Sequence, residues 1–251
     1  MFYDPYFYLC AIPAILLMGL SKGGFGGGVG GFSLPLLLLV MPPVQAAAIM
    51  LPLLCLADFT GLKAYYGKWN WTILRVILPG AAVGTLLGWA LFEYLPSSVI
   101  LVLIGSISAS YALYQLARRR ARKVNHRPPS KGLGWFWSGV SGVTSFVAHA
   151  GGPPLQIYML PLRLDKEVFI ATTNLFFLLV NLIKLGPYFM LGQFSSSNLL
   201  LCAVLAPFVP LGVYSGVYLQ RRVDIHTFYT LLQIFLFLTG SLLIYQGWRS
   251  F

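Results

Sequence analysis

Residues 19–35 read Gly19-Leu-Ser-Lys-Gly-Gly-Phe-Gly-Gly-Gly-Val-Gly-Gly-Phe-Ser-Leu-Pro35, a glycine-rich interruption inside an apolar part of the chain. A second interruption, Gly139-Val-Ser-Gly-Val-Thr-Ser-Phe-Val-Ala-His-Ala-Gly-Gly-Pro-Pro154, lies in the other half. A shift of 121 positions places Phe25 on Phe146, and Gly30-Gly31 on Gly151-Gly152. Because glycine disfavours helix, the two stretches predict one helix break in each half. Paired breaks of this kind in a membrane protein indicate a solute site.

The composition places the chain among membrane proteins. Hydrophobic residues make up 58% of the 251 residues, charged residues make up 9%, and the mean hydropathy is +0.78. Soluble domains rarely reach these values, because their surfaces need charge. Three runs with little or no charge are long enough to cross a bilayer: Ser97–Ala117, Ser195–Gln220 and Ile225–Trp248. We therefore predict an all-α polytopic membrane protein.

Apolar runs separated by turn residues predict ten helical segments. They are residues 6–20, 29–41, 44–66, 72–92, 97–117, 132–148, 152–162, 168–190, 196–219 and 225–247. The first two segments and the sixth and seventh are short, so each pair is expected to form a broken or re-entrant helical hairpin. The spacing of Pro79, Gly84 and Gly88 is the same as that of Pro207, Gly212 and Gly216. Such small residues are expected to serve helix packing.

The basic residues predict how the segments cross the membrane. With a hairpin and three spans in each half and the N-terminus outside, 14 of the 17 lysines and arginines fall in inside loops. The positive-inside rule favours this arrangement. It makes the halves inverted repeats, residues 1–117 and 132–251, joined by a basic cytoplasmic linker at 118–131. Because the apolar stretch Tyr6–Leu20 lacks a basic leader and a small-x-small cleavage site, we expect it to stay in the mature chain.

Charge and cysteines exclude several other classes. The net charge is +11, but seven of the 17 basic residues lie between Arg118 and Lys131, which fits a topology signal better than nucleic-acid binding. Cys10, Cys55 and Cys202 are scattered and lack the spacing of a metal site or a disulfide framework. We therefore expect no metal site, no cofactor and no nucleic-acid partner.

The helix breaks suggest an anion site. Broken helices within a membrane leave backbone groups that must line something, and helix N-termini attract anions. Ser33 is placed to cap the first such helix, with Pro35 in its opening turn. Pro153 and Pro154 suit the start of the second helix.

Charged residues at membrane depth are the other candidates. Lys22 is expected within the first break, and Lys184 about two turns from the outer end of its segment. The alternatives are that the break reaches the aqueous rim, and that Lys184 extends to the outer interface. Spacings of seven and three place Asn174, Asn181 and Lys184 on one helix face. Asp58, which aligns with Asn181 at a shift of 123, either balances a lysine or carries a coupling proton, and the ion pair is favoured.

Thr144, Ser145 and His149 line the second break, where hydroxyls and an imidazole suit an oxyanion. A hydrogen-bonded structural role is an equal alternative for His149. No residue is predicted to be catalytic. The predicted substrate-binding set is Ser21, Lys22, Gly30, Gly31, Ser33, Thr144, Ser145, His149, Gly151, Gly152, Asn174, Asn181 and Lys184, with Asp58 as the proton-coupling candidate.

These motifs together resemble a known family. The glycine-rich first stretch, Ser145–Pro154, Asn181-Leu-Ile-Lys-Leu-Gly-Pro-Tyr188 and the two proline–glycine helices are similar to the TauE/SafE sulfite exporter family, also called the toluene sulfonate uptake permeases. The resemblance covers about residues 8–247. It implies a multi-pass permease of the bacterial inner membrane for sulfite, sulfonates and other organosulfur anions. Thr144, Ser145 and His149 depart from the commoner glycine-rich form of the second stretch.

The resulting hypothesis is a secondary transporter that exports a small sulfur oxyanion by alternating access. A passive anion channel shares the same site chemistry and is the first alternative. An intramembrane enzyme or assembly factor is the second, although the six acidic residues and three histidines form no catalytic motif. The expected partners are the anion and the lipid bilayer, and a homo-oligomer is left open.

Overall fold

A computed structural model describes residues 5–27, 33–91, 97–120 and 129–249. These residues form helices joined by short turns, with no strand among them, as the sequence predicts. Helix contacts divide the chain into two compact units. Unit 1 contains residues 1–69 and 170–222, and unit 2 contains residues 70–169 and 223–251. Each unit therefore takes helices from both halves of the sequence.

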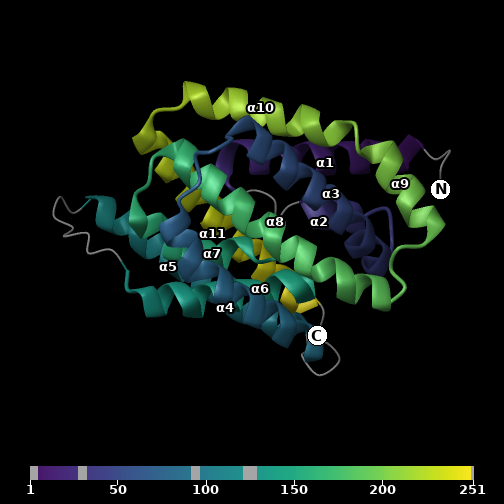
Figure 1. Cartoon of the computed structure of the whole chain (residues 1–251), viewed down its shortest axis with the longest axis horizontal. Helices are drawn as coiled ribbons and strands as arrows, with labels where there is room; N and C mark the ends of the chain where they lie inside the picture. The colour runs from purple at the N-terminus through teal and green to yellow at the C-terminus, as the bar shows by residue number, and fades with distance from the viewer. Residues whose placement is uncertain (1–4, 28–32, 92–96, 121–128, 250–251) are drawn as a thin grey trace. The chain divides into compact units, whose positions relative to one another are not determined.

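Unit 1 holds three helices from the first half of the chain and three from the second. They are α1 (Pro5–Phe25), α2 (Ser33–Leu38), α3 (Pro43–Ala64), α8 (Lys166–Met190, except its first turn), α9 (Ser196–Leu205) and α10 (Phe208–Arg222). Helices α1 and α10 run side by side over most of their length (Figure 1). Helix α3 packs against both of them and against α9.

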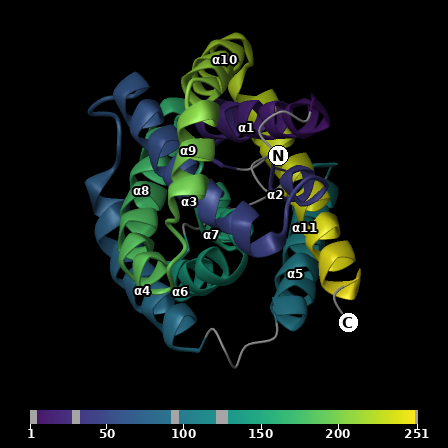
Figure 2. The same ribbon diagram turned by 90° about the vertical axis from the view of Figure 1, so that its right-hand side faces the viewer.

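Unit 2 is built around two close helix pairs. Its helices are α4 (Trp71–Ala90), α5 (Ser97–Arg120), α6 (Lys131–Ala148), α7 (Gly152–Met159), the 3-10 turn η2 (Leu160–Leu162) and α11 (Ile225–Arg249). Helix α4 packs along α6, and α5 packs along α11 (Figure 2). The short α7 contacts α5, α6 and α11. Asp224 accepts hydrogen bonds from the backbone amides of His226 and Thr227 in the first turn of α11. Hydrogen bonds from Thr227, from its side chain and its amide, lower the pKa of the Asp224 carboxyl group.

Five described helices are long and apolar enough to cross a membrane: α1, α3, α4, α8 and α11. The pair α9 and α10 makes a sixth if the two are counted as one span. The chain is therefore a polytopic α-helical membrane protein.

Two boundaries differ from the sequence prediction. The first segment does not end at residue 20 but continues to Phe25, so α1 has 21 residues and is long enough to span. The ninth segment is not one straight span, because it breaks before Phe208 and bends by 40°. Pro207 explains the break, since proline cannot donate a helical hydrogen bond.

Helix glycines allow the close pairs to form, as predicted. A Cβ on Gly23 of α1 would lie 1.9 Å from the carbonyl oxygen of Val213 in α10. In unit 2 a Cβ on Gly84 of α4 would lie 2.0 Å from the carbonyl oxygen of Gly139 in α6. Both pairs thus pack backbone against backbone, which only small residues permit.

The helix ends give a register between the two halves that differs from the sequence shift of 121. Helix α1 ends at Phe25 and α6 at Ala148, and the next residues, Gly26 and His149, both have left-handed backbones with φ of 56° and 50°. Helices α3 and α8 begin at Pro43 and Lys166. All three pairs lie 123 positions apart. The glycine pairs at 30–31 and 151–152 match at a sequence shift of 121, so the two registers differ by two residues.

Candidate functional site

The charged residues predicted at membrane depth meet inside unit 1. Lys22 lies in the last turn of α1 and is 5% exposed, and Asp58 of α3 is completely buried. The Lys22 Nζ atom is 2.7 Å from the Asp58 Oδ1 atom. The prediction that Lys22 lies within the glycine break was wrong, because α1 continues past it to Phe25. The favoured ion pair of Asp58 with a lysine is confirmed.

Helix α8 extends this ion pair into a chain of four side chains. The Asn181 Nδ2 atom donates to the Asp58 Oδ2 atom at 2.8 Å, and the Lys184 Nζ atom donates to the Asn181 Oδ1 atom at 3.3 Å. Lys184 is completely buried, so it does not extend to the interface. We call Lys22, Asp58, Asn181 and Lys184 the charged cluster. Three candidate spans, α1, α3 and α8, supply its side chains.

Hydrogen bonds also hold the buried carboxyl-terminal end of α1. The last carbonyl groups of a helix lack partners within it. The Lys22 carbonyl accepts a hydrogen bond from Asn174 Nδ2 at 3.1 Å, and the Gly23 carbonyl accepts one from the Tyr65 hydroxyl at 2.6 Å. The Ser21 carbonyl accepts one from the Gly27 amide at 3.0 Å. These bonds fix the turn that carries the Lys22 ammonium group.

Close packing holds the lysine and the asparagine in place. The Lys22 Nζ atom lies 4.2 Å from the centroid of the Phe177 ring, a cation–π contact. Asn174 lies against Gly61 of α3, where an added Cβ would be 2.3 Å from Asn174 Nδ2. Position 61 therefore has no room for a side chain unless Asn174 moves.

The other candidates of the first stretch are less central. Ser21 is buried in α1. Ser33 is the first residue of α2 rather than a cap before it, and its buried hydroxyl has no hydrogen-bond partner among the described residues. Pro35 lies in the opening turn of α2, as predicted. Gly30 and Gly31 lie outside the described residues.

The second break, in unit 2, is closed by its own hydrogen bonds. The Ser141 hydroxyl donates to the Gly151 carbonyl at 2.7 Å, and the Thr144 hydroxyl donates to the Val140 carbonyl of its own helix at 2.9 Å. The Thr144 and Ser145 carbonyls accept bonds from the amides of Ala150 and His149, both at 3.2 Å. The hydroxyl donors of Ser141 and Thr144 are thus used within the break.

Backbone geometry explains the small residues at this break. His149 takes the left-handed conformation that ends α6. A Cβ on Gly151 would lie 2.8 Å from the Ser141 carbonyl oxygen, so this residue can approach α6 only as glycine. Gly152 begins α7, followed by Pro153 and Pro154 at its start, as predicted. These residues belong to a different unit from the charged cluster.

A comparison with known families identifies the chain. A family model described as Sulfite exporter TauE/SafE matches residues 11–243, which include both glycine-rich stretches and the whole charged cluster. The chain belongs to the TauE/SafE sulfite exporter family. The resemblance predicted from the motifs is thereby confirmed. No curated protein and no solved structure matches the chain.

Membership of the TauE/SafE family supports membrane transport of sulfur anions and fits a protein that is not an enzyme. Within the described residues no group of three or more His, Cys, Asp or Glu side chains is arranged to hold a metal ion. The ammonium groups of the charged cluster are strong hydrogen-bond donors to an anion.

Sequence reasoning missed three residues of this TauE/SafE chain. Tyr65 binds the end of α1, and Phe177 contacts Lys22. Gln156 of α7 is 1% exposed, and neither amide atom has a hydrogen-bond partner among the described residues. Gln156 could have been found from the sequence, because it is the lone amide in the apolar segment 152–162 and an unpaired buried amide is costly.

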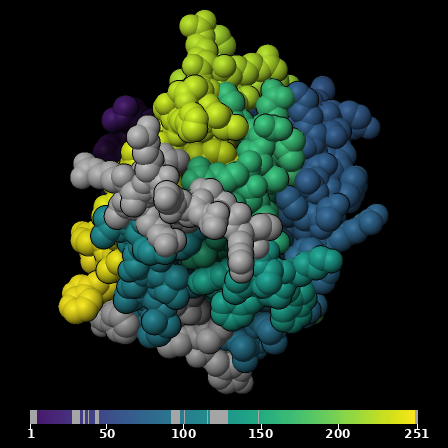
Figure 3. Space-filling model, turned by 90° about the vertical axis from the view of Figure 1, so that its left-hand side faces the viewer, coloured from purple at the N-terminus to yellow at the C-terminus, as the bar shows by residue number. Residues whose placement is uncertain are grey.

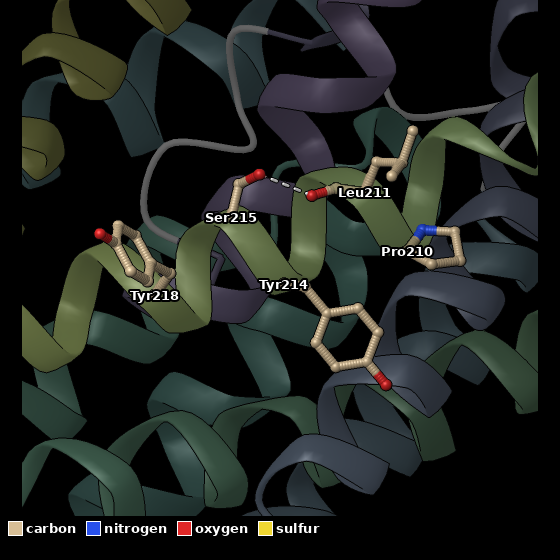
Figure 4. A pocket seen from close by; sticks show the side chains of 5 residues that line it. All are labelled: Pro210, Leu211, Tyr214, Ser215 and Tyr218. Carbon is tan, nitrogen blue, oxygen red and sulfur yellow. Dashed lines mark hydrogen bonds between the residues drawn. The ribbon is translucent and has the colours of Figure 1, made fainter.

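A surface groove on α10 has a different character. It has a volume of about 420 Å³ and is lined by Pro210, Leu211, Tyr214, Ser215 and Tyr218 (Figure 4). The Ser215 hydroxyl bonds to the Leu211 carbonyl of its own helix. The space-filling view shows the carboxyl-terminal end of α10 at the molecular surface (Figure 3). Exposed tyrosine and leucine side chains on a membrane helix suit contact with lipid.

Proposed function

We propose that this chain is a secondary transporter that carries a small sulfur oxyanion, sulfite or an organosulfonate, by alternating access. The observation that carries the proposal is the charged cluster, buried where α1, α3 and α8 meet. Membership of the TauE/SafE family supports the class of substrate.

The energetics of buried charge favour a functional role for the cluster. An ammonium group at the centre of the bilayer costs roughly 2.5–3.5 kcal/mol on insertion scales, so lysines at that depth are rare outside functional sites. Lys22 and Lys184 are both buried, and the one carboxylate of the cluster, that of Asp58, contacts Lys22 directly and is connected to Lys184 through Asn181. A small anion would complete the compensation of charge and accept the ammonium hydrogen bonds.

The contact between Asp58 and Asn181 supports a site at the axis of an inverted repeat. These two residues are counterparts, 123 positions apart, and they hydrogen-bond to each other. Residues that contact their own counterparts lie close to the axis relating the repeats. In inverted repeats this axis lies in the membrane plane, so the cluster would lie near the bilayer midplane. The repeats are residues 1–117 and 132–251, connected by the linker 118–131.

The distribution of basic residues and the membrane potential support a location and a direction of transport. The protein lies in the bacterial inner membrane with the basic linker in the cytoplasm, because most basic residues fall on that side. Export of an anion is aided by the inside-negative potential, about 2.3 kcal/mol per charge at 100 mV. Substrate and lipid are its partners, and association with a second copy is compatible with this function.

Flux into proteoliposomes tests the proposal. Purified chain is reconstituted, and uptake of sulfite and of methanesulfonate is measured for the wild type, Lys22→Gln, Lys184→Gln and the control Lys63→Gln. Lys63 lies on α3 but is exposed. We expect saturable flux with trans-stimulation in the wild type and the control, and at least about a tenfold loss in each cluster variant. Linear, non-saturable conductance would indicate a channel, and normal flux in both cluster variants would refute the assigned site.

A further inference from the structure

We propose that Asp58 sets the charge of the anion that the site accepts, so that monoanions bind in preference to dianions. The class of ligand is an organosulfonate or hydrogensulfite, rather than sulfate, thiosulfate or fully deprotonated sulfite. The inference rests on the proposed function, because it assigns a substrate charge to the same buried cluster.

The first argument is the charge balance of unit 1. The cluster contains two lysines, Lys22 and Lys184, and one aspartate, Asp58, all at most 5% exposed. The sequence has no other acidic residue between positions 5 and 92 and none between 168 and 223. Asp58 is therefore the only acidic residue that the structure describes in unit 1. With both ammonium groups protonated, the cluster carries one net positive charge.

The second argument is the cost of uncompensated charge in an apolar interior. A net charge buried without a partner is far more expensive there than in water. Binding of a monoanion brings the cluster to neutrality. Binding of a dianion leaves one net negative charge at the same depth. The dianion also loses more hydration when it leaves water, so the difference between the two ligands increases.

The third argument is the polarity of the neighbouring amide. Asn174 donates through Nδ2 to the Lys22 carbonyl, which fixes the orientation of its amide. Its Oδ1 atom is buried and has no hydrogen-bond partner within the described part of the chain. A buried acceptor of this kind repels additional negative charge and suits a ligand that retains a proton to donate.

Methanesulfonate and sulfate make a matched pair for the test, because both have a tetrahedral sulfur and their charges are fixed near neutral pH. Binding of each anion to the purified full chain is measured from its concentration-dependent rise in melting temperature. We expect the wild type to bind methanesulfonate at least about tenfold more tightly than sulfate. The control Lys63→Gln should keep this ratio.

Asp58→Asn changes the net charge of the cluster from one positive charge to two. We expect the ratio to shift toward sulfate by at least about tenfold in this variant. If Asp58→Asn does not fold, Lys184→Gln replaces it as the test, because it makes the cluster neutral. That variant should bind both anions at least about tenfold more weakly than the wild type.

The outcomes separate the two proposals. We call the proposed preference for monoanions the charge rule. It would be overturned if the wild type bound both anions equally, if the ratio were unchanged in Asp58→Asn, or if binding were undiminished in Lys184→Gln. Absence of binding of either anion to the wild type would overturn it as well. Selective binding without flux in proteoliposomes would leave the charge rule standing and refute the transport proposal.

Discussion

Removing one member of the Lys22–Asp58 pair should destabilise the protein to a degree that depends on which member is lost. Lys22→Met leaves the Asp58 carboxylate hydrogen-bonded to Asn181, which in turn binds Lys184. The cluster then contains one cation and one anion. Asp58→Asn instead leaves two buried ammonium groups with no carboxylate between them.

The structure gives the order and approximate size of these effects. Breaking a buried ion pair typically costs about 3–5 kcal/mol when it strands a charge, and this is the value expected for Asp58→Asn. Lys22→Met loses one charge-assisted contact of 2.7 Å but strands no unmatched charge, so it should cost about 1.5–3 kcal/mol. The double variant restores the wild-type net charge and should be more stable than Asp58→Asn alone.

Unfolding in mixed micelles of mild detergent and SDS, followed by tryptophan fluorescence, measures these free energies. The exposed Lys63→Met on α3 is the matched control and should change stability by about 0.5 kcal/mol or less. The reasoning is refuted if Lys22→Met costs as much as Asp58→Asn. Additive losses in the double variant would refute it too, since contacting residues should be coupled.

Two further predictions concern the helix contacts that hold the cluster and the second break, and both use the same unfolding measurement. Gly23→Ala should destabilise the protein by about 1–3 kcal/mol or more, because its Cβ would lie 1.9 Å from the Val213 carbonyl oxygen. Gly186→Ala should be neutral or stabilise by up to about 1 kcal/mol, because nothing lies within 4 Å of its Cβ; equal effects would contradict this explanation. Ser141→Ala should cost about 1–3 kcal/mol, because it leaves the buried Gly151 carbonyl without its 2.7 Å hydrogen bond, and an unchanged free energy would exclude this role of the hydroxyl.

Much of the fold could be predicted from the sequence because membrane helices carry strong local signals. The starts of α3, α4, α6, α8 and α11 agree with the apolar segments to within two residues. The family could also be predicted, since its motifs extend over nearly the whole chain. The same signals failed at Phe25, because glycines that usually end a helix here continue it to make room for α10.

The pairing within the cluster could be predicted only in part. The spacing of Asn174, Asn181 and Lys184 placed them on one face of α8, and Asp58 was expected to balance a lysine. Which lysine it contacts depends on how far α1 continues, and that is decided by packing against another helix. The bend before Phe208 was missed for a similar reason, since a proline in a membrane helix can be accommodated or can break it.

If the halves are the inverted repeats proposed above, the register of 123 explains why the charges are divided unequally between them. Counterparts that contact each other at a two-fold axis cannot both be the same charged residue, because two adjacent carboxylates repel each other unless they share a proton. With aspartate at position 58 and asparagine at 181, that repulsion becomes a hydrogen bond of 2.8 Å. Lys184 likewise has Gly61 as its counterpart, and Lys22 has Ser145. In the proposed inverted repeat, a charged site on the axis therefore loses the symmetry of the repeat at positions 58 and 181.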